Sequence, residues 1–441
     1  MIQLSDHFNF GRLIRFTLPS VTMLVFTSVY GVVDGFFVSN FVGKTPFAAV
    51  NFIMPFLMVL GCVGFMFGTG GGALIAKSMG EGDRDRANKI FTMIVAVSAA
   101  CGVVLAVAGF FSVRQVASLL GAEGAMLEDS VAYAQIILVS LPAYILQYEF
   151  QCLFATAEKP KLGLYVTVAA GLTNIALDAL FVAVFGWGLV GAAVATALSQ
   201  LVGGVLPVVY FFCPNSSLLR FTRFSFDVKA LLKTCANGSS ELMSNVSMSL
   251  VGMLYNVQLL SYAGENGVAA YGVLMYVNLV FQAMFIGFSV GGAPVISYHS
   301  GARNYDELKG LLKKGLIIIS VLAVVMFAAA ELLSKPLAYM FVGYDKGLLD
   351  ITVNAFFIYS FSFIFSGFAV FGSSFFTALN DGLISALISF LRTLVFQIAA
   401  VMTFPLIWGL NGIWLSIVAA EVMADIVTAI LLIIKRKKYH Y

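Results

Sequence analysis

The chain has 441 residues, of which 60% are hydrophobic and only 11% are charged, with a formal net charge of +3. Soluble domains carry about 25% charged residues, so this composition excludes an ordinary soluble protein and indicates an integral membrane protein. The small net charge gives no support to a nucleic-acid-binding surface or to an acidic substrate.

Twelve apolar stretches are each long enough to cross a bilayer, which takes about 20 helical residues. In chain order the predicted spans are 13–40, 47–77, 90–111, 131–157, 163–185, 189–213, 230–263, 268–299, 311–333, 349–379, 383–404 and 410–434. The predicted fold class is therefore an all-α integral membrane protein with twelve transmembrane helices.

Positive charge predicts the orientation, because Lys and Arg gather in the cytoplasmic loops of membrane proteins. Twenty of the 25 basic residues precede the first span or follow an even-numbered span. They are Arg12, Arg15, Lys77, Arg84, Arg86, Lys89, Lys159, Lys161, Arg220, Arg223, Lys229, Lys233, Arg303, Lys309, Lys313, Lys314, Lys435, Arg436, Lys437 and Lys438. We therefore expect a multi-pass membrane protein with both termini in the cytoplasm.

The two halves of the sequence repeat, and each contains six predicted spans. A shift of 221 residues aligns identical residues without a gap: Gly43 with Gly264, Gly80 with Gly301, and the Trp-Gly-Leu of 187–189 with that of 408–410. Six spans return the chain to the same side, so the repeat is parallel, as in transporters that rock two halves about a central site. We predict lobes at 1–213 and 230–441 joined by a cytoplasmic linker at 214–229. A symmetric channel is the alternative.

Four polar side chains of the first half are predicted to lie at one depth in the membrane. Asn174 and Asp178 are one helical turn apart on the fifth span, and Asp34 and Thr196 fall at comparable depth in the first and sixth. A charge at membrane depth costs about 3 kcal/mol, so it rarely faces lipid. These residues are predicted to bind a coupling proton or sodium ion, or the substrate. A polar pair that only holds helices together is the alternative.

The second half lacks these carboxylates. At the same shift, the partners of Asp34, Asn174, Asp178 and Thr196 are Tyr255, Val395, Ala399 and Ile417. A polar pair kept only for packing has no reason to occur in one half of the sequence and not in the other. The asymmetry favours a single functional cation site in the first half.

Other charged residues at membrane depth are possible accessories. Glu241 and Glu421 fall near mid-depth in the second half, and Glu149 lies in the inner half of the fourth span. Arg392 is expected to face a wet cytoplasmic opening or to pair with one of these acids, since a lone arginine in lipid is disfavoured. The histidines and cysteines show no metal-ligand spacing.

Several of these residues resemble the multidrug and toxic compound extrusion (MATE) family. The resemblance covers essentially the whole chain and rests on Pro19 and Asp34 in the first span, the turn at Gly43, the loop at 80–87, Asn174-x3-Asp178 in the fifth span and Thr196 in the sixth. The Glu-Lys-Pro of 158–160, with Gly238 and Glu241 in the seventh span, is most similar to its MepA-like branch of small bacterial drug exporters.

The family resemblance implies a V-shaped pair of lobes in a bacterial inner membrane, and the antiport of amphipathic, often cationic, compounds against protons or sodium ions. In the family, the positions of Asp34, Asn174, Asp178 and Thr196 form the cation site of the first lobe. Some relatives bind the ion in the second lobe with an aspartate of the tenth span. No acidic residue lies between 351 and 379 here, which favours coupling in the first lobe.

The predicted function is secondary active multidrug efflux by alternating access, and not enzyme catalysis. We expect a monomer in the lipid bilayer that needs no cofactor and no nucleic-acid partner. One alternative is a flippase or exporter of lipid-linked or other small metabolites, although the intramembrane residues here are mainly acidic. An intramembrane hydrolase would have only Asp34 and Asp178 as a catalytic pair. The sequence leaves the choice between proton and sodium open.

Overall fold

The computed structural model describes residues 2–343 and 345–441, with the side chains of Phe36, Ser39, Asn40, Lys44 and Thr45 outside that description. Its elements are α1 (Phe10–Phe37), η1 (Val38–Val42), α2 (Lys44–Gly61), α3 (Val63–Gly80), α4 (Arg84–Leu119), α5 (Gly124–Val139), α6 (Leu141–Thr156), α7 (Pro160–Asp178), η2 (Ala179–Val184), α8 (Gly188–Phe212), α9 (Val228–Gly301), α10 (Tyr305–Val342), α11 (Lys346–Tyr359), α12 (Ser362–Ala378), α13 (Gly382–Phe390), η3 (Leu391–Val395), α14 (Phe396–Thr403), α15 (Pro405–Trp408) and α16 (Leu410–Tyr439). The three η elements are π-helical.

The helices of the described chain account for the twelve predicted spans. Nine are long and apolar enough to cross a membrane, and two bent pairs, α5 with α6 and α11 with α12, bring the number to eleven. The 74-residue α9 is two helices that meet at Gly264, where φ is 61° and ψ is −151°. Tyr255 and Tyr271 stack with ring centroids 5.5 Å apart, whereas sixteen residues of continuous helix would separate them by about 24 Å. The chain therefore reverses at Gly264, which gives the twelfth span.

Two spans are broken where the sequence predicted continuous helices. The fourth span bends by 62° between α5 and α6, and the tenth bends by 49° between α11 and α12. Pro142 stands in the first turn of α6, just after the break at Ser140. Proline has no backbone N–H to continue a helix from the preceding turn, so the bend falls directly before it.

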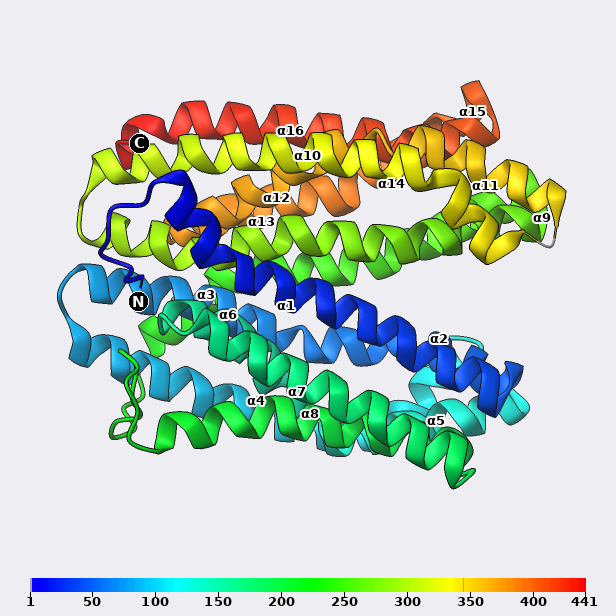
Figure 1. The fold of residues 1–441 in the computed structure, drawn as a ribbon, viewed down its shortest axis with the longest axis horizontal. Helices are drawn as coiled ribbons and strands as arrows, with labels where there is room; N and C mark the ends of the chain where they lie inside the picture. Colours follow the sequence, from blue (N-terminus) through cyan, green and yellow to red (C-terminus); the bar gives the residue numbers. More distant parts are fainter. Residues whose placement is uncertain (1, 344) are drawn as a thin grey trace.

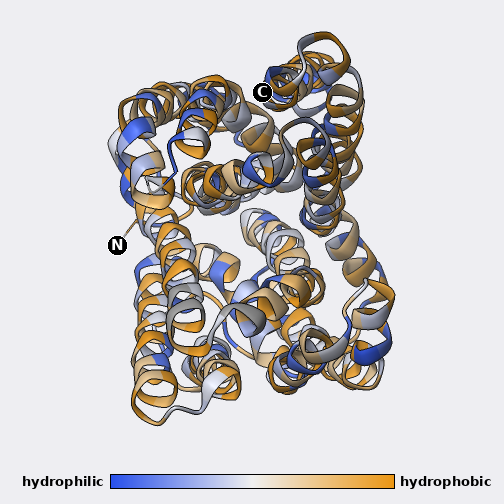
Figure 2. Ribbon diagram, turned by 90° about the vertical axis from the view of Figure 1, so that its right-hand side faces the viewer, coloured by the Kyte–Doolittle hydropathy of each residue, from blue (hydrophilic) through white to orange (hydrophobic). Residues whose placement is uncertain are grey.

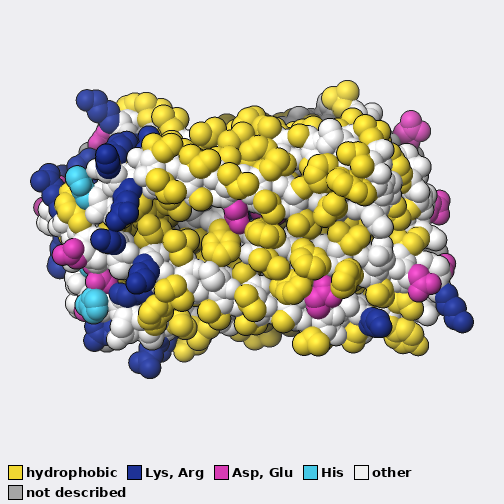
Figure 3. All heavy atoms as spheres, turned by 90° about the horizontal axis from the view of Figure 1, so that it is seen from above, with side chains coloured by type: hydrophobic (Ala, Val, Ile, Leu, Met, Phe, Trp, Pro, Cys, Tyr) yellow, Lys and Arg dark blue, Asp and Glu magenta, His cyan; other side chains and the backbone are white. Residues whose placement is uncertain are grey.

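The helices form two lobes, α1 to α8 and α9 to α16, that lie side by side along one common direction (Figure 1). Seen from the end opposite the termini, most helices are viewed nearly end-on and are largely hydrophobic (Figure 2). Both termini lie at the same end of the molecule, and the Lys and Arg side chains gather there on the surface shown in Figure 3. We call this the basic end.

The backbone repeats at the turns that the sequence repeat aligns. Gly43 and Gly264 have φ of 125° and 61°, and Gly188 and Gly409 have φ of 60° and 59°. Side chains are rarely tolerated at such angles, so glycine is needed at both members of each pair. The repeat therefore preserves these turns as well as the helices between them.

The lobes pack backbone to backbone near the basic end. A Cβ added to Gly238 of α9 would lie 1.9 Å from the Met66 carbonyl oxygen of α3, and one added to Gly80 would lie 2.0 Å from the Tyr298 oxygen. Further from the basic end, a Cβ added to Gly31 of α1 or to Gly252 of α9 would meet nothing within 4 Å. The two lobes are thus in close contact at the basic end and separate toward the other end.

The segment between the lobes is fixed to the first lobe. The backbone N–H of Arg220 donates to Asn88 Oδ1 at 2.9 Å, and that of Thr222 donates to Thr92 Oγ1 at 3.0 Å, both on α4. Residues 214–227 therefore lie against α4 instead of forming a free connection.

Candidate functional site

The two carboxylates of the first lobe lie beside π-helical segments. Asp178 is the last residue of α7 before η2, and the Asp34 carbonyl accepts a hydrogen bond from Val38 N–H, the first residue of η1. π-helical turns in α-helices are rare and occur frequently at functional sites, because the extra residue redirects the neighbouring side chains. Here η1 and η2 also contact each other, which brings the two carboxylate-bearing spans together.

The structure brings together the four side chains that the sequence analysis selected. Asn174 Nδ2 donates to Thr196 Oγ1 at 3.4 Å, and the Thr196 hydroxyl donates to Asp34 Oδ1 at 3.4 Å. The carboxyl group of Asp178 lies close to that of Asp34. Asp178 is completely buried, and Asp34 is only 8% exposed. Residues from α1, α7 and α8 thus form one enclosed polar cluster, called the first-lobe cluster below.

The first-lobe cluster has more acceptors than donors. Within the described part of the chain, both carboxylate oxygens of Asp178 and Oδ1 of Asn174 are buried and accept no hydrogen bond. Buried polar atoms are normally satisfied, and a buried carboxylate is especially costly when it is not. Two adjacent carboxylates with unsatisfied oxygens favour a proton or a cation between them, since either one supplies the missing positive charge. The atoms that the cluster offers as ligands are all oxygens, and oxygen ligands also suit a hard cation such as sodium.

Two tyrosines near the cluster were not selected from the sequence. Tyr133 of α5, which is 1% exposed, lies beside Thr196 and close to both carboxylates. Tyr30 of α1 lies close to Asp34 and interacts with Gln147. Tyrosines are common in this sequence, which has 17, so residue type alone gave no reason to choose these two.

Of the accessory residues, Glu241 lies where the two lobes meet. It lines a small pocket together with Thr69 and Cys152 of the first lobe and Ser374 of the second. None of the four residues of the first-lobe cluster lines this pocket, so Glu241 lies apart from that cluster.

The other accessory residues are paired inside single lobes. Arg392 forms a two-point ion pair with Glu421, with Nε–Oε2 at 2.8 Å and Nη2–Oε1 at 2.9 Å. This is one of the two arrangements expected for Arg392. Glu149 is fully buried and accepts a hydrogen bond from Ser98. Neither Glu149 nor the pair joins the first-lobe cluster.

The second lobe has a neutral counterpart of this cluster. Tyr255 Oη donates to Gln397 Oε1 at 2.7 Å and lies 2.9 Å from Ser416 Oγ. Tyr255 was the predicted partner of Asp34, but the predicted partners Val395 and Ala399 are exposed and point away from this position. Gln397, which follows the π-helical η3, bonds to Tyr255 instead of either residue that the fixed shift aligned.

Comparison with known proteins identifies the family and its fold. The MatE family model matches residues 19–180 and 242–403, once in each lobe. The multidrug export protein MepA of Staphylococcus saprophyticus is 23% identical over 437 residues, covering 97% of this chain and 94% of that protein. MepA of Staphylococcus aureus is 21% identical over 436 residues with the same coverage.

Solved structures agree in fold. A crystal structure of MATE in complex with MaL6 has a TM-score of 0.93 at 22% identity, covering 98% of both chains. An outward-facing conformation of a multidrug resistance MATE family transporter has a TM-score of 0.93 at 22% identity, covering 98% of this chain and 97% of that one. At this identity the likeness establishes the two-lobe transporter fold.

Proposed function

Because the chain belongs to the MatE family, we propose that it is a secondary active transporter that exports amphipathic or cationic compounds in exchange for protons or sodium ions. The observation that carries the proposal is the first-lobe cluster, in which Asp34 and Asp178 lie together with buried oxygens that lack donors. The export proteins to which the chain is similar over nearly its full length support the substrate class.

We propose that the lobes 1–213 and 230–441 move relative to each other about the small pocket that Glu241 lines between them. The basic end, where the lobes are packed together, would be the cytoplasmic end, and the structure would represent an outward-facing state. A proton or sodium ion entering from outside would bind between Asp34 and Asp178 and neutralise them. The cationic compound would then lose its electrostatic attraction to this lobe and leave outward.

The return step would release the ion to the cytoplasm and restore the negative charge. Ion and compound then compete, and by linkage each weakens the binding of the other by the same factor. Glu241 would attract the cationic part of the compound in the small pocket between the lobes, and Thr69, Cys152 and Ser374 line the same pocket. The neutral group of Tyr255, Gln397 and Ser416 would bind no coupling ion, which supports coupling in the first lobe.

Purified protein in vesicles tests this function directly. We expect a fluorescent cationic dye to move against its gradient only when a pH or a sodium gradient is imposed, and the effective gradient identifies the ion. Dye affinity should fall as the concentration of that ion rises. Affinity unchanged between about pH 5 and 8 and across sodium concentrations would contradict competition at the two carboxylates.

The membrane orientation has its own test. In a chain with all five native cysteines replaced, a single cysteine is placed either at Glu81, between α3 and α4, or at Lys346, the first residue of α11. We expect an impermeant thiol reagent to label Glu81→Cys only in opened cells and Lys346→Cys in intact cells, because basic loops stay in the cytoplasm. Labelling of both positions in intact cells would contradict the proposed inner-membrane topology.

A further inference from the structure

A short N-terminal segment, residues 2–9, connects the two lobes at the basic end. We call it the strap. It has no regular secondary structure, yet Leu4 and Phe8 are fully buried. Its first contact is with the first lobe, where the backbone N–H of Leu4 donates to Glu158 Oε1 at 2.5 Å. Glu158 lies in the turn between α6 and α7.

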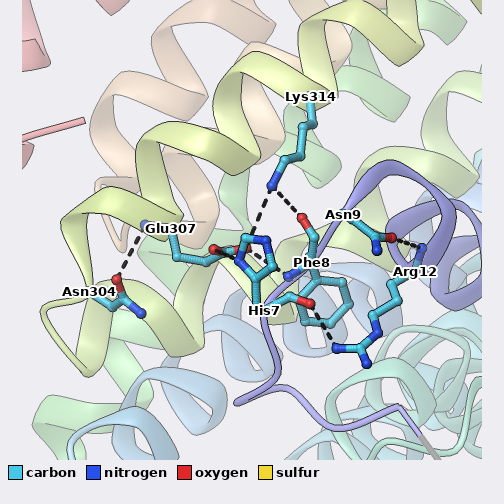
Figure 4. Close-up of polar contacts among 7 residues, drawn as sticks. All are labelled: His7, Phe8, Asn9, Arg12, Asn304, Glu307 and Lys314. Atoms are coloured by element: carbon cyan, nitrogen blue, oxygen red, sulfur yellow. Dashed lines mark hydrogen bonds and ion pairs between the residues drawn. The ribbon is translucent and has the colours of Figure 1, made fainter.

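The second contact of the strap is with α10 of the second lobe (Figure 4). The backbone N–H of Phe8 donates to Glu307 Oε1 at 2.9 Å, and His7 Nδ1 lies 2.6 Å from Glu307 Oε2. Lys314, two turns further along α10, donates to the Phe8 carbonyl oxygen. Both backbone groups of Phe8 are thus held by charged side chains of the second lobe.

The Phe8 ring packs between the lobes. It makes edge contacts with Phe16 of α1, at 5.8 Å between ring centroids, and with His299 at the end of α9, at 6.5 Å. Phe16 belongs to the first lobe and His299 to the second. Burial of this ring therefore requires that the two lobes stay together at the basic end.

The length of the strap limits what happens when the lobes part. Leu4 and Phe8 are four residues apart and can span at most about 14 Å of extended chain. The strap also continues directly into α1, which starts at Phe10 in the first lobe. A separation of the basic ends would therefore pull His7 and Phe8 away from Glu307 while leaving them tied to the first lobe.

We propose that the strap is a releasable clasp that stabilises the state closed at the basic end, with Glu307 as the residue that holds it. Glu307 is a positioning residue: it acts on the equilibrium between the two lobe arrangements and does not touch the transported compound. Hydrogen bonds to a charged group are stronger than neutral ones, so their release sets a threshold for opening toward the basic end. The proposal rests on the alternating-access part of the proposed function.

The test measures the distance between the lobes by electron paramagnetic resonance. Spin labels replace Lys89 of α4 and Lys309 of α10, both exposed at the basic end, in protein lacking the exposed Cys213. The Glu307→Gln variant, and a chain lacking residues 2–8, are compared with the parent in the same lipid. We expect the ratio of long-distance to short-distance populations to rise about tenfold, because charged hydrogen bonds that favour only one state are lost.

Asp306→Asn is the matched control. Asp306 is an exposed carboxylate one residue before Glu307 in the same turn, so this variant makes the same chemical change without altering the clasp. It should leave the distance distribution unchanged. Equal distributions for the parent, Glu307→Gln and the shortened chain would overturn the proposal. So would an equal shift for Asp306→Asn.

The distance measurement also separates this proposal from the proposed function. If dye transport is absent but the distances shift as expected, the proposed role of the strap is supported and the substrate assignment is wrong. If transport occurs and the distances do not respond to Glu307→Gln or to loss of the strap, the proposed role of the strap is wrong and the proposed function is unaffected.

Discussion

Asp34→Asn and Asp178→Asn should each reduce gradient-driven dye efflux to the level of protein-free vesicles. Each substitution keeps the shape of the side chain and removes one of the two negative charges that would hold the coupling ion. Asp178 is fully buried and has no donor to either oxygen within the described residues, so its amide variant is not expected to break a hydrogen-bonded network. Folding is checked by thermal unfolding and gel filtration, and activity by efflux under the gradient that drives the parent protein.

Tyr255→Phe is the control at the equivalent position of the second lobe. It removes the hydroxyl group that bonds to Gln397 and Ser416 but leaves the buried ring in place. We expect a stability loss of about 1 kcal/mol, the usual value of a single hydrogen bond, with efflux retained. If Tyr255→Phe abolished efflux as completely as the aspartate variants, the asymmetry between the lobes would lose its functional meaning.

Gly238→Val should prevent the lobes from closing at the basic end. The valine Cβ would lie 1.9 Å from the Met66 carbonyl oxygen, a backbone atom that cannot move aside as a flexible side chain could. Overpacking of this kind costs about 1–3 kcal/mol, which changes a two-state ratio by a factor of about 5 to 150. We expect efflux to be lost and the distance between the basic ends of the lobes to increase.

Gly252→Val on the same helix is the control for Gly238→Val. A Cβ added to Gly252 meets nothing within 4 Å, so valine meets no steric obstacle there, and its helix propensity is no lower than that of glycine. This variant should transport normally and keep the parent distances. Normal transport by Gly238→Val would mean that close packing at this crossing is not needed for the cycle.

The sequence by itself determined the architecture, because its signals do not depend on distant contacts. The length of the apolar stretches defined the twelve spans. The distribution of Lys and Arg assigned both termini to the same side of the membrane as the basic loops. The repeated glycines at Gly43, Gly264, Gly188 and Gly409 marked turns that the backbone repeats. Asp34 and Asp178 could be selected because a carboxylate is rare and costly inside an apolar span.

The tertiary structure decided which polar groups meet and where the lobes touch. Tyr133 of α5 lies beside the first-lobe cluster, and Gln397, which follows the π-helical η3, bonds to Tyr255 where the sequence shift had aligned Val395. The strap carries no strong sequence signal, since its role depends on Glu158 and Glu307, which are 149 residues apart in the sequence. Spacing along one helix can be read from sequence periodicity, but contacts between helices depend on bends and crossings that only the packed lobes define.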